Sequence, residues 1–96
     1  YEWEKTKSGN IKREIKMNHQ KVMSFAGIYN SIKIENKLVE SVVIVTQEAN
    51  ESLSKIHNRM PLIIPHGLEQ DWINSENPQM MIQSINDMKK FEFSIF

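Results

Sequence analysis

The chain has 96 residues, and its 12 basic and 12 acidic side chains give a formal net charge of zero at pH 7. Charge alone therefore gives no argument for a nucleic-acid, membrane or acidic partner. The absence of cysteine excludes disulfides, thiolate metal sites and a cysteine nucleophile within these residues. No apolar run approaches the roughly 20 residues of a membrane helix. We expect one domain at most, a piece of a longer protein, because the chain opens inside an aromatic, strand-like run.

The first half of the chain predicts short strands separated by polar turns. Residues 1–5, a Ser-Gly-Asn turn at 8–10 and residues 11–17 predict a β-hairpin. Residues 22–29 and 38–46 are apolar, and the second run is too uniformly apolar for a strand with one wet face. We expect both to be central strands.

The basic side chains are unevenly distributed along the chain. Residues 1–21 hold six basic groups and three acidic ones. This excess is compatible with a phosphate-facing edge, and equally with a hairpin edge that lysines protect from aggregation.

A short helix and a corner follow the second apolar run. Asn50 is a good N-cap for a helix of under two turns over residues 51–56. Pro61 disfavours helical geometry at the residue before it and directs the chain into a strand at 62–64. His57 is therefore predicted to lie at a helix-to-strand corner.

The remaining residues predict two helices and a closing strand. One helix is expected around residues 68–73, and a second from an Asn77 cap, with Pro78 in its first turn, to about residue 87. Residues 91–95 alternate apolar and polar side chains, which predicts a final strand. The apolar stripe of the second helix consists of Met81, Ile85 and Met88.

Few residues could carry chemistry. His19, His57 and His66 have no short metal-ligand spacing, so we expect no metal site. No phosphate-binding loop, dinucleotide fingerprint or nucleophile elbow is present. His57 could exchange protons near neutral pH, and Arg59 could hold a phosphate through its planar donor fork. The same residues could equally form a structural corner, with Arg59 paired to a carboxylate and His57 hydrogen-bonded to the backbone.

Glu2 is the other candidate because it lies between Tyr1 and Trp3. A carboxylate among aromatic side chains can serve as a general acid or base. Neighbouring residues of a strand point to opposite faces, however, so an exposed glutamate on an edge strand remains open.

Five sequence blocks occur in an order that resembles the SOS response-associated peptidase family. They span residues 1–73, and together they are specific where each alone would be weak. The blocks are Tyr1-Glu2-Trp3, Phe25-Ala26-Gly27-Ile28-Tyr29, Ile44-Val45-Thr46-Gln47-Glu48-Ala49-Asn50, Ile56-His57-Asn58-Arg59-Met60-Pro61 and Trp72.

The resemblance implies a single α+β domain built around a curved, barrel-like antiparallel sheet with short flanking helices. Residues 1–96 would be its C-terminal part. It implies a sensor of abasic sites in single-stranded DNA, acting in the SOS response to DNA damage, in the bacterial cytoplasm or nucleoid, with no cofactor. An N-terminal cysteine, outside these residues, would form a thiazolidine crosslink with the DNA, and the peptidase activity would be self-processing that exposes this cysteine. Lyase-like chemistry at the lesion is also implied.

The resemblance also implies residue roles. Glu2 would be the general acid/base, His57 would assist opening of the sugar ring, and Arg59 and Thr46 would contact DNA phosphates. Asn58 stands where the family usually has aspartate, which removes a charge that could orient Arg59. Two alternatives stay open: a non-catalytic single-stranded DNA binding module, and a structural fragment that leaves the joint occurrence of these residues unexplained.

Overall fold

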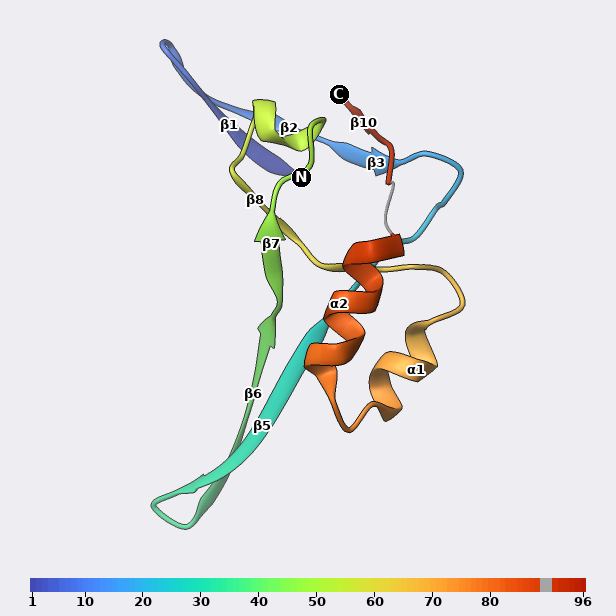
Figure 1. Ribbon diagram of the computed structural model, residues 1–96. Coiled ribbons are helices and arrows are strands. Elements are labelled where there is room, and N and C mark those ends of the chain that lie inside the picture. Colours follow the sequence, from blue (N-terminus) through green and yellow to red (C-terminus); the bar gives the residue numbers. More distant parts are fainter. Residues whose placement is uncertain (89–90) are drawn as a thin grey trace.

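The computed structural model describes residues 1–88 and 91–96, which form short strands and helices (Figure 1). The strands are β1 (Glu2–Thr6), β2 (Gly9–Arg13), β3 (Ile15–Met17), β4 (Ser24–Phe25), β5 (Gly27–Ile34), β6 (Lys37–Ile44), β7 (Thr46–Glu48), β8 (Arg59–Pro61), β9 (Ile63–Ile64) and β10 (Phe93–Ile95). The helices are the 3-10 turn η1 (Leu53–Lys55), α1 (Glu69–Asn74) and α2 (Pro78–Met88). The α+β class is confirmed.

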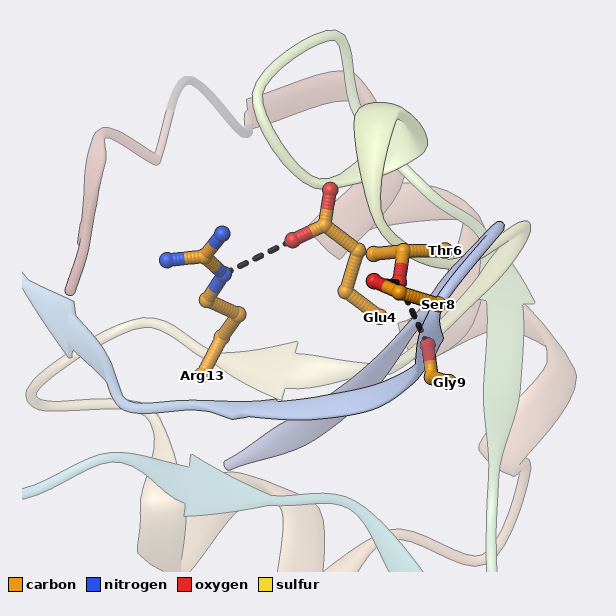
Figure 2. Close-up of polar contacts among 5 residues, drawn as sticks. All are labelled: Glu4, Thr6, Ser8, Gly9 and Arg13. Atoms are coloured by element: carbon orange, nitrogen blue, oxygen red, sulfur yellow. Dashed lines mark hydrogen bonds and ion pairs between the residues drawn. The ribbon is translucent and has the colours of Figure 1, made fainter.

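The predicted N-terminal hairpin is confirmed. β1 and β2 pair antiparallel, with Glu2 opposite Arg13 and Thr6 opposite Gly9. Gly9 has a φ of +129°, which a residue with a side chain rarely adopts, and the Thr6 hydroxyl donates a 2.6 Å hydrogen bond to its carbonyl (Figure 2). The predicted second strand ends early, because the chain leaves this pairing at Glu14 and β3 then pairs with β10. The predicted closing strand is thereby confirmed over Phe93–Ile95.

The expectation of two central strands was wrong. β5 and β6 pair with each other in an eight-residue register and project from the rest of the molecule as an arm (Figure 1). Ile28 and Val43 on one face, and Tyr29 and Val42 on the other, are all exposed. Within the described residues these two strands have no packed layer on either face, so their apolar side chains stay exposed.

Hydrogen bonds join this arm to the body at its base. The Ala26 N–H donates to the Leu62 carbonyl at 2.8 Å, the Val45 N–H donates to Ala26 at 2.9 Å, and the Leu62 N–H donates to Val45 at 2.8 Å. Trp72 of α1 adds a 3.0 Å bond from its indole N–H to the carbonyl of Gly27. These bonds fix the direction in which the arm leaves the body.

Two small hydrophobic cores hold the body together. One lies beneath η1 and consists of Met17, Leu53, Met60, Ile63 and Phe93. The other lies against the two α-helices and consists of Ala26, Leu62, Ile64, Trp72 and Ile85. Residues 60–64 contribute to both, so the segment from β8 to β9 connects the two cores.

Both predicted α-helices are confirmed. The Asn77 side-chain oxygen accepts a hydrogen bond from the Met80 N–H at 3.3 Å, as expected of an N-cap. Ile85 of the predicted stripe is fully buried and Met81 is partly buried, whereas the side chain of Met88 lies outside the described residues. Neither helix, nor any other in the described part of the chain, is long and apolar enough to cross a membrane.

The strands do not close into a barrel. Within the described residues they form five separate two-stranded antiparallel sheets. Closure requires each strand to hydrogen-bond to neighbours on both sides, and here each strand pairs along one side only. The β1–β2 hairpin and the β5–β6 arm also make the molecule extended. Its radius of gyration is 16.0 Å, whereas a compact domain of this length has about 12.5 Å.

Candidate active site

The corner that carries His57 is built by Asn50. Its side-chain oxygen accepts the Leu53 N–H at 3.0 Å, the bond expected of the predicted cap, but the predicted helix over residues 51–56 is shortened to the 3-10 turn η1, which begins at Leu53. Its side-chain NH₂ donates to the Phe91 carbonyl at 3.2 Å. The buried side chain of Leu53 then anchors η1 in the core. These hydrogen bonds and the packing of Leu53 thus hold the backbone that carries His57 in place.

Glu2 and His57 meet across the molecule. The His57 Nε2 lies 3.9 Å from the Glu2 carboxylate oxygen Oε2, although the two residues lie near opposite ends of the matched sequence blocks. Both side chains are partly exposed, at 42% for His57 and 33% for Glu2. The separation allows Coulombic attraction when the imidazole is protonated but is too long for a direct hydrogen bond. A small movement of either side chain would bring the two groups within hydrogen-bond distance.

The other ring nitrogen of His57 faces the backbone of Arg59. The Arg59 N–H lies 3.1 Å from Nδ1, and the Arg59 carbonyl lies 2.9 Å from the same atom. An unprotonated Nδ1 accepts the bond from the N–H, whereas a protonated Nδ1 donates to the carbonyl. The backbone of Arg59 therefore offers Nδ1 a hydrogen-bond partner whether or not this nitrogen carries a proton.

Arg59 is oriented by Thr46. The Arg59 Nη2 donates to the Thr46 hydroxyl at 3.1 Å across the β7–β8 pair. Both side chains are exposed, so the guanidinium is held at the surface rather than buried in an ion pair. Thr46 therefore supplies an orienting contact for the guanidinium in this chain. A guanidinium has five N–H donors, of which this bond uses one.

A cavity of about 140 Å³ brings most of these groups together. Glu2, His57 and Arg59 lie on its wall, and Thr46 contacts it only through Arg59. The remaining lining is mostly apolar and consists of Tyr1, Ile15, Met23, Phe25, Leu53, Met60, Pro61, Ile63 and Phe93. The cavity thus combines ionisable side chains with a mostly apolar lining, and it is smaller than the roughly 300–1,000 Å³ of ordinary ligand pockets.

One neighbour of the site was not found by sequence reasoning. Arg13 lies directly opposite Glu2 in the β1–β2 register, and its Nε donates to the Glu4 carboxylate at 2.7 Å (Figure 2). This diagonal pair places a cation beside Glu2 on the same face of the hairpin. The predicted hairpin did not give this register, because a turn at residues 8–10 would set Glu2 against Lys16, whereas the chain turns at residues 7–8, with Thr6 opposite Gly9.

No metal centre accompanies the site in the described part of the chain, where no three His, Asp or Glu side chains gather closely enough to hold an ion. The groups on hand are a carboxylate, an imidazole, a guanidinium and a hydroxyl. These groups support proton transfer and anion binding.

Comparison with known proteins places this arrangement in a family. The model of the SOS response associated peptidase (SRAP) family matches residues 1–95. The abasic site processing protein YoaM of Bacillus subtilis is 34% identical over 80% of this chain and 35% of its own length. YoqW, a protein of the same description in B. subtilis and in Bacillus phage SPbeta, is 31% identical over 98% of this chain and 46% of its own length.

The fold has a solved counterpart. The crystal structure of a protein from Bacteroides thetaiotaomicron matches 99% of this chain and 44% of its own, with a TM-score of 0.76 and 25% identity. The chain therefore belongs to the SRAP family. It spans less than half the length of these relatives.

Proposed function

We propose that the protein carrying these residues senses abasic sites in single-stranded DNA and captures them as a covalent thiazolidine crosslink. The observation that carries the proposal is the 3.9 Å approach of His57 to Glu2 on the wall of a cavity. It is supported by the names of the curated relatives, which are abasic site processing proteins. The crosslinking group would be an N-terminal cysteine outside the 96 residues, which contain no cysteine.

His57 would act on the sugar. The abasic deoxyribose opens when its anomeric hydroxyl loses a proton and its ring oxygen gains one, which frees the aldehyde. An imidazole with a backbone partner in both protonation states can accept the first proton and return one to the ring oxygen. His57 would also hydrogen-bond near the phosphate of the lesion.

Glu2 would serve the condensation. The cysteine amine adds to the aldehyde, and loss of one water leaves an imine. The thiol sulfur then bonds to the imine carbon while the nitrogen takes a proton, which closes the thiazolidine ring. A carboxyl group can protonate the departing hydroxyl and remove the proton from nitrogen, and reversal uses the same transfers.

Arg59 and Thr46 would hold the DNA backbone. A guanidinium fixed at the surface can bind a phosphate through its remaining donors, and the Thr46 hydroxyl lies beside it. Such contacts position the strand without reading its sequence. In the full protein we expect residues 1–96 to form the C-terminal part of one SRAP domain whose curved sheet approaches a barrel.

The proposal extends to the setting of the reaction. We place the protein in the DNA-damage response of the bacterial cytoplasm or nucleoid. Its peptidase activity would be hydrolysis of the bond preceding the cysteine, and its lyase-like activity would act at the captured lesion. The alternative is a non-catalytic single-stranded DNA binding module, for which the surface position of Arg59 is the favouring observation.

The test is adduct formation by the full protein on single-stranded DNA with one abasic site. We expect a band that survives denaturing electrophoresis, is lost when the N-terminal cysteine is replaced, and forms more slowly in Glu2→Gln and His57→Asn. Glu40→Gln on β6 and His66→Asn are the matched controls, because each removes the same group outside the cavity. No adduct, together with salt-sensitive binding weakened by Arg59→Ala, would establish the binding module instead.

A further inference from the structure

Arg13 has two carboxylates within reach on one face of the β1–β2 hairpin. Glu2 lies directly opposite it in the strand register, and Glu4 lies diagonally, two residues further along β1. The guanidinium pairs with Glu4, whose carboxylate accepts a 2.7 Å hydrogen bond from the Arg13 Nε (Figure 2). Glu4 is itself opposite Ile11, which offers no charge. Among the described residues, Arg13 thus makes its ion pair with Glu4, and Glu2 makes its own with His57.

The Arg13–Glu4 pair is better shielded from water than the other ion pair near it. Its two side chains are 37% and 26% exposed, whereas those of the Lys16–Glu14 pair are 61% and 64% exposed. Charges that are partly withdrawn from water are screened less, and a short hydrogen bond between charged groups is among the stronger ones. Glu4 therefore holds the Arg13 guanidinium in a defined place.

The position of this guanidinium matters for Glu2. The ionisable side chains around Glu2 come from β1, β2 and the η1–β8 corner and are Tyr1, Glu4, Arg13, His57 and Arg59. The other elements that line the cavity contribute apolar side chains. A guanidinium against a carboxylate favours its ionised form. The role given to Glu2 in the condensation, however, requires this carboxyl group to take up a proton and release it.

We propose that Glu4 is a positioning residue of the active site, which binds Arg13 and so keeps its guanidinium away from Glu2. With Glu4 in place, the Glu2 carboxylate faces His57 and exchanges protons with the reacting groups. Without the charge of Glu4, Arg13 turns to its direct cross-strand neighbour, because opposite charges across a strand pair attract each other. The inference rests on the proposed function for the reaction that Glu2 serves.

Rates of adduct formation by the full protein test this role through a rescue. Glu4→Gln should slow the reaction about tenfold at pH 7, because an adjacent cation lowers the pKa of a carboxyl group by about 1–3 units and each unit reduces its protonated form tenfold. Adding Arg13→Gln to this variant should restore most of the rate, because the competing cation is then gone. Glu4→Asp keeps the charge and should retain more of the rate than Glu4→Gln. Glu40→Gln on β6 is the matched control.

The His57 ring gives a second measurement that requires no DNA. Glu2, at 3.9 Å, attracts the protonated imidazole, and a guanidinium bound to Glu2 offsets this attraction. In Glu4→Gln the pH midpoint of the His57 NMR signals should therefore fall by about half a unit, the size expected of a partly exposed ion pair. His66 lies 3.5 Å from Glu69 and is the internal control, whose midpoint should not move.

The outcomes separate this inference from the proposed function. A double variant as slow as Glu4→Gln would show that the ion pair only supports the hairpin, and it would overturn the inference. A wild-type rate or an unmoved His57 midpoint in Glu4→Gln would overturn it as well. Failure of the wild-type protein to form any adduct would overturn the crosslinking function, whereas the shift of the His57 midpoint would still support the hold of Glu4 on Arg13.

Discussion

The β7–η1–β8 corner and the β5–β6 arm are adjoining pieces of the chain with opposite characters. In the corner, Asn50 caps η1, Leu53 is buried, and the backbone and side chain of Arg59 are both engaged. In the arm, a longer and more apolar pair of strands exposes nearly all its side chains. Within these 96 residues the corner is held by hydrogen bonds and a buried side chain, whereas the two strands of the arm pair only with each other.

Two leucines offer the largest test of this comparison. Leu62, at 1% exposure, joins the body cores, while Leu38 on the arm is 62% exposed. We expect Leu62→Ala to lower the free energy of unfolding by about 2–5 kcal/mol, because it leaves a cavity, and Leu38→Ala to change it by under about 0.5 kcal/mol. Urea denaturation of the two variants measures both. Equal losses would show that the arm is as well packed as the body.

The next effect concerns DNA binding at the corner. Arg59→Ala should weaken binding of the full protein to single-stranded DNA about tenfold, the cost of one charged hydrogen bond, and should flatten its salt dependence. The control is Lys33→Ala, which removes a charge from the arm. Affinities measured at several salt concentrations would contradict the assignment if both variants behaved alike.

The Asn50 cap should give a smaller change. Asn50→Ala removes the bond to the Leu53 N–H and the bond to the Phe91 carbonyl. We expect a loss of about 1 kcal/mol in unfolding free energy. Ser52 precedes η1 but makes no side-chain cap bond, so Ser52→Ala is the matched control and should have little effect. Similar midpoints for the two variants in thermal unfolding would remove Asn50 as the organiser of the corner.

The smallest effect is a pH dependence at α1. Hydrogen bonds from its own backbone N–H and from that of Gly67, with a contribution from His66, lower the pKa of Glu69 below its usual 4.5. The ionised Glu69 carboxylate therefore stabilises the folded state fully above about pH 4.5, the ordinary pKa of the group. This stabilisation is lost as the pH falls through the lower pKa of the folded state. Glu69→Gln should lower the melting temperature slightly at pH 7 and leave it unchanged in strong acid. Glu76→Gln, on the surface between the helices, is the comparison.

Local chemistry made several of these features predictable. The Asn50 and Asn77 caps and the corner at His57 follow from side chains and proline acting on their own neighbours, and all three are present. The tight turn of the arm was missed. Glu35 and Asn36 both have positive φ, a geometry usually signalled by an Asn-Gly pair, and Glu35 gives no such signal.

Long-range features escaped local reasoning. The run at residues 42–45 could not reveal that β6 has only one neighbouring strand, since that depends on the pairing of the whole chain. The approach of Glu2 to His57 also depends on non-local packing, and the hairpin pattern alone left Glu2 as an exposed edge residue. Only the family resemblance, carried by the order of the sequence blocks, predicted that Glu2 and His57 belong to one site.

The central claim is that His57 and Glu2 transfer protons at one site, His57 in opening the sugar ring and Glu2 in the condensation that follows, and a double-mutant cycle on the rate of adduct formation tests it most directly. Each of Glu2→Gln and His57→Asn should slow the full protein by about 100-fold or more, the usual contribution of a general acid or base. The account predicts that the double variant is scarcely slower than the slower single one, because the slower of two successive steps sets the overall rate and the two losses are then not additive. Losses that multiply would contradict the assignment of the two side chains to successive steps at this site.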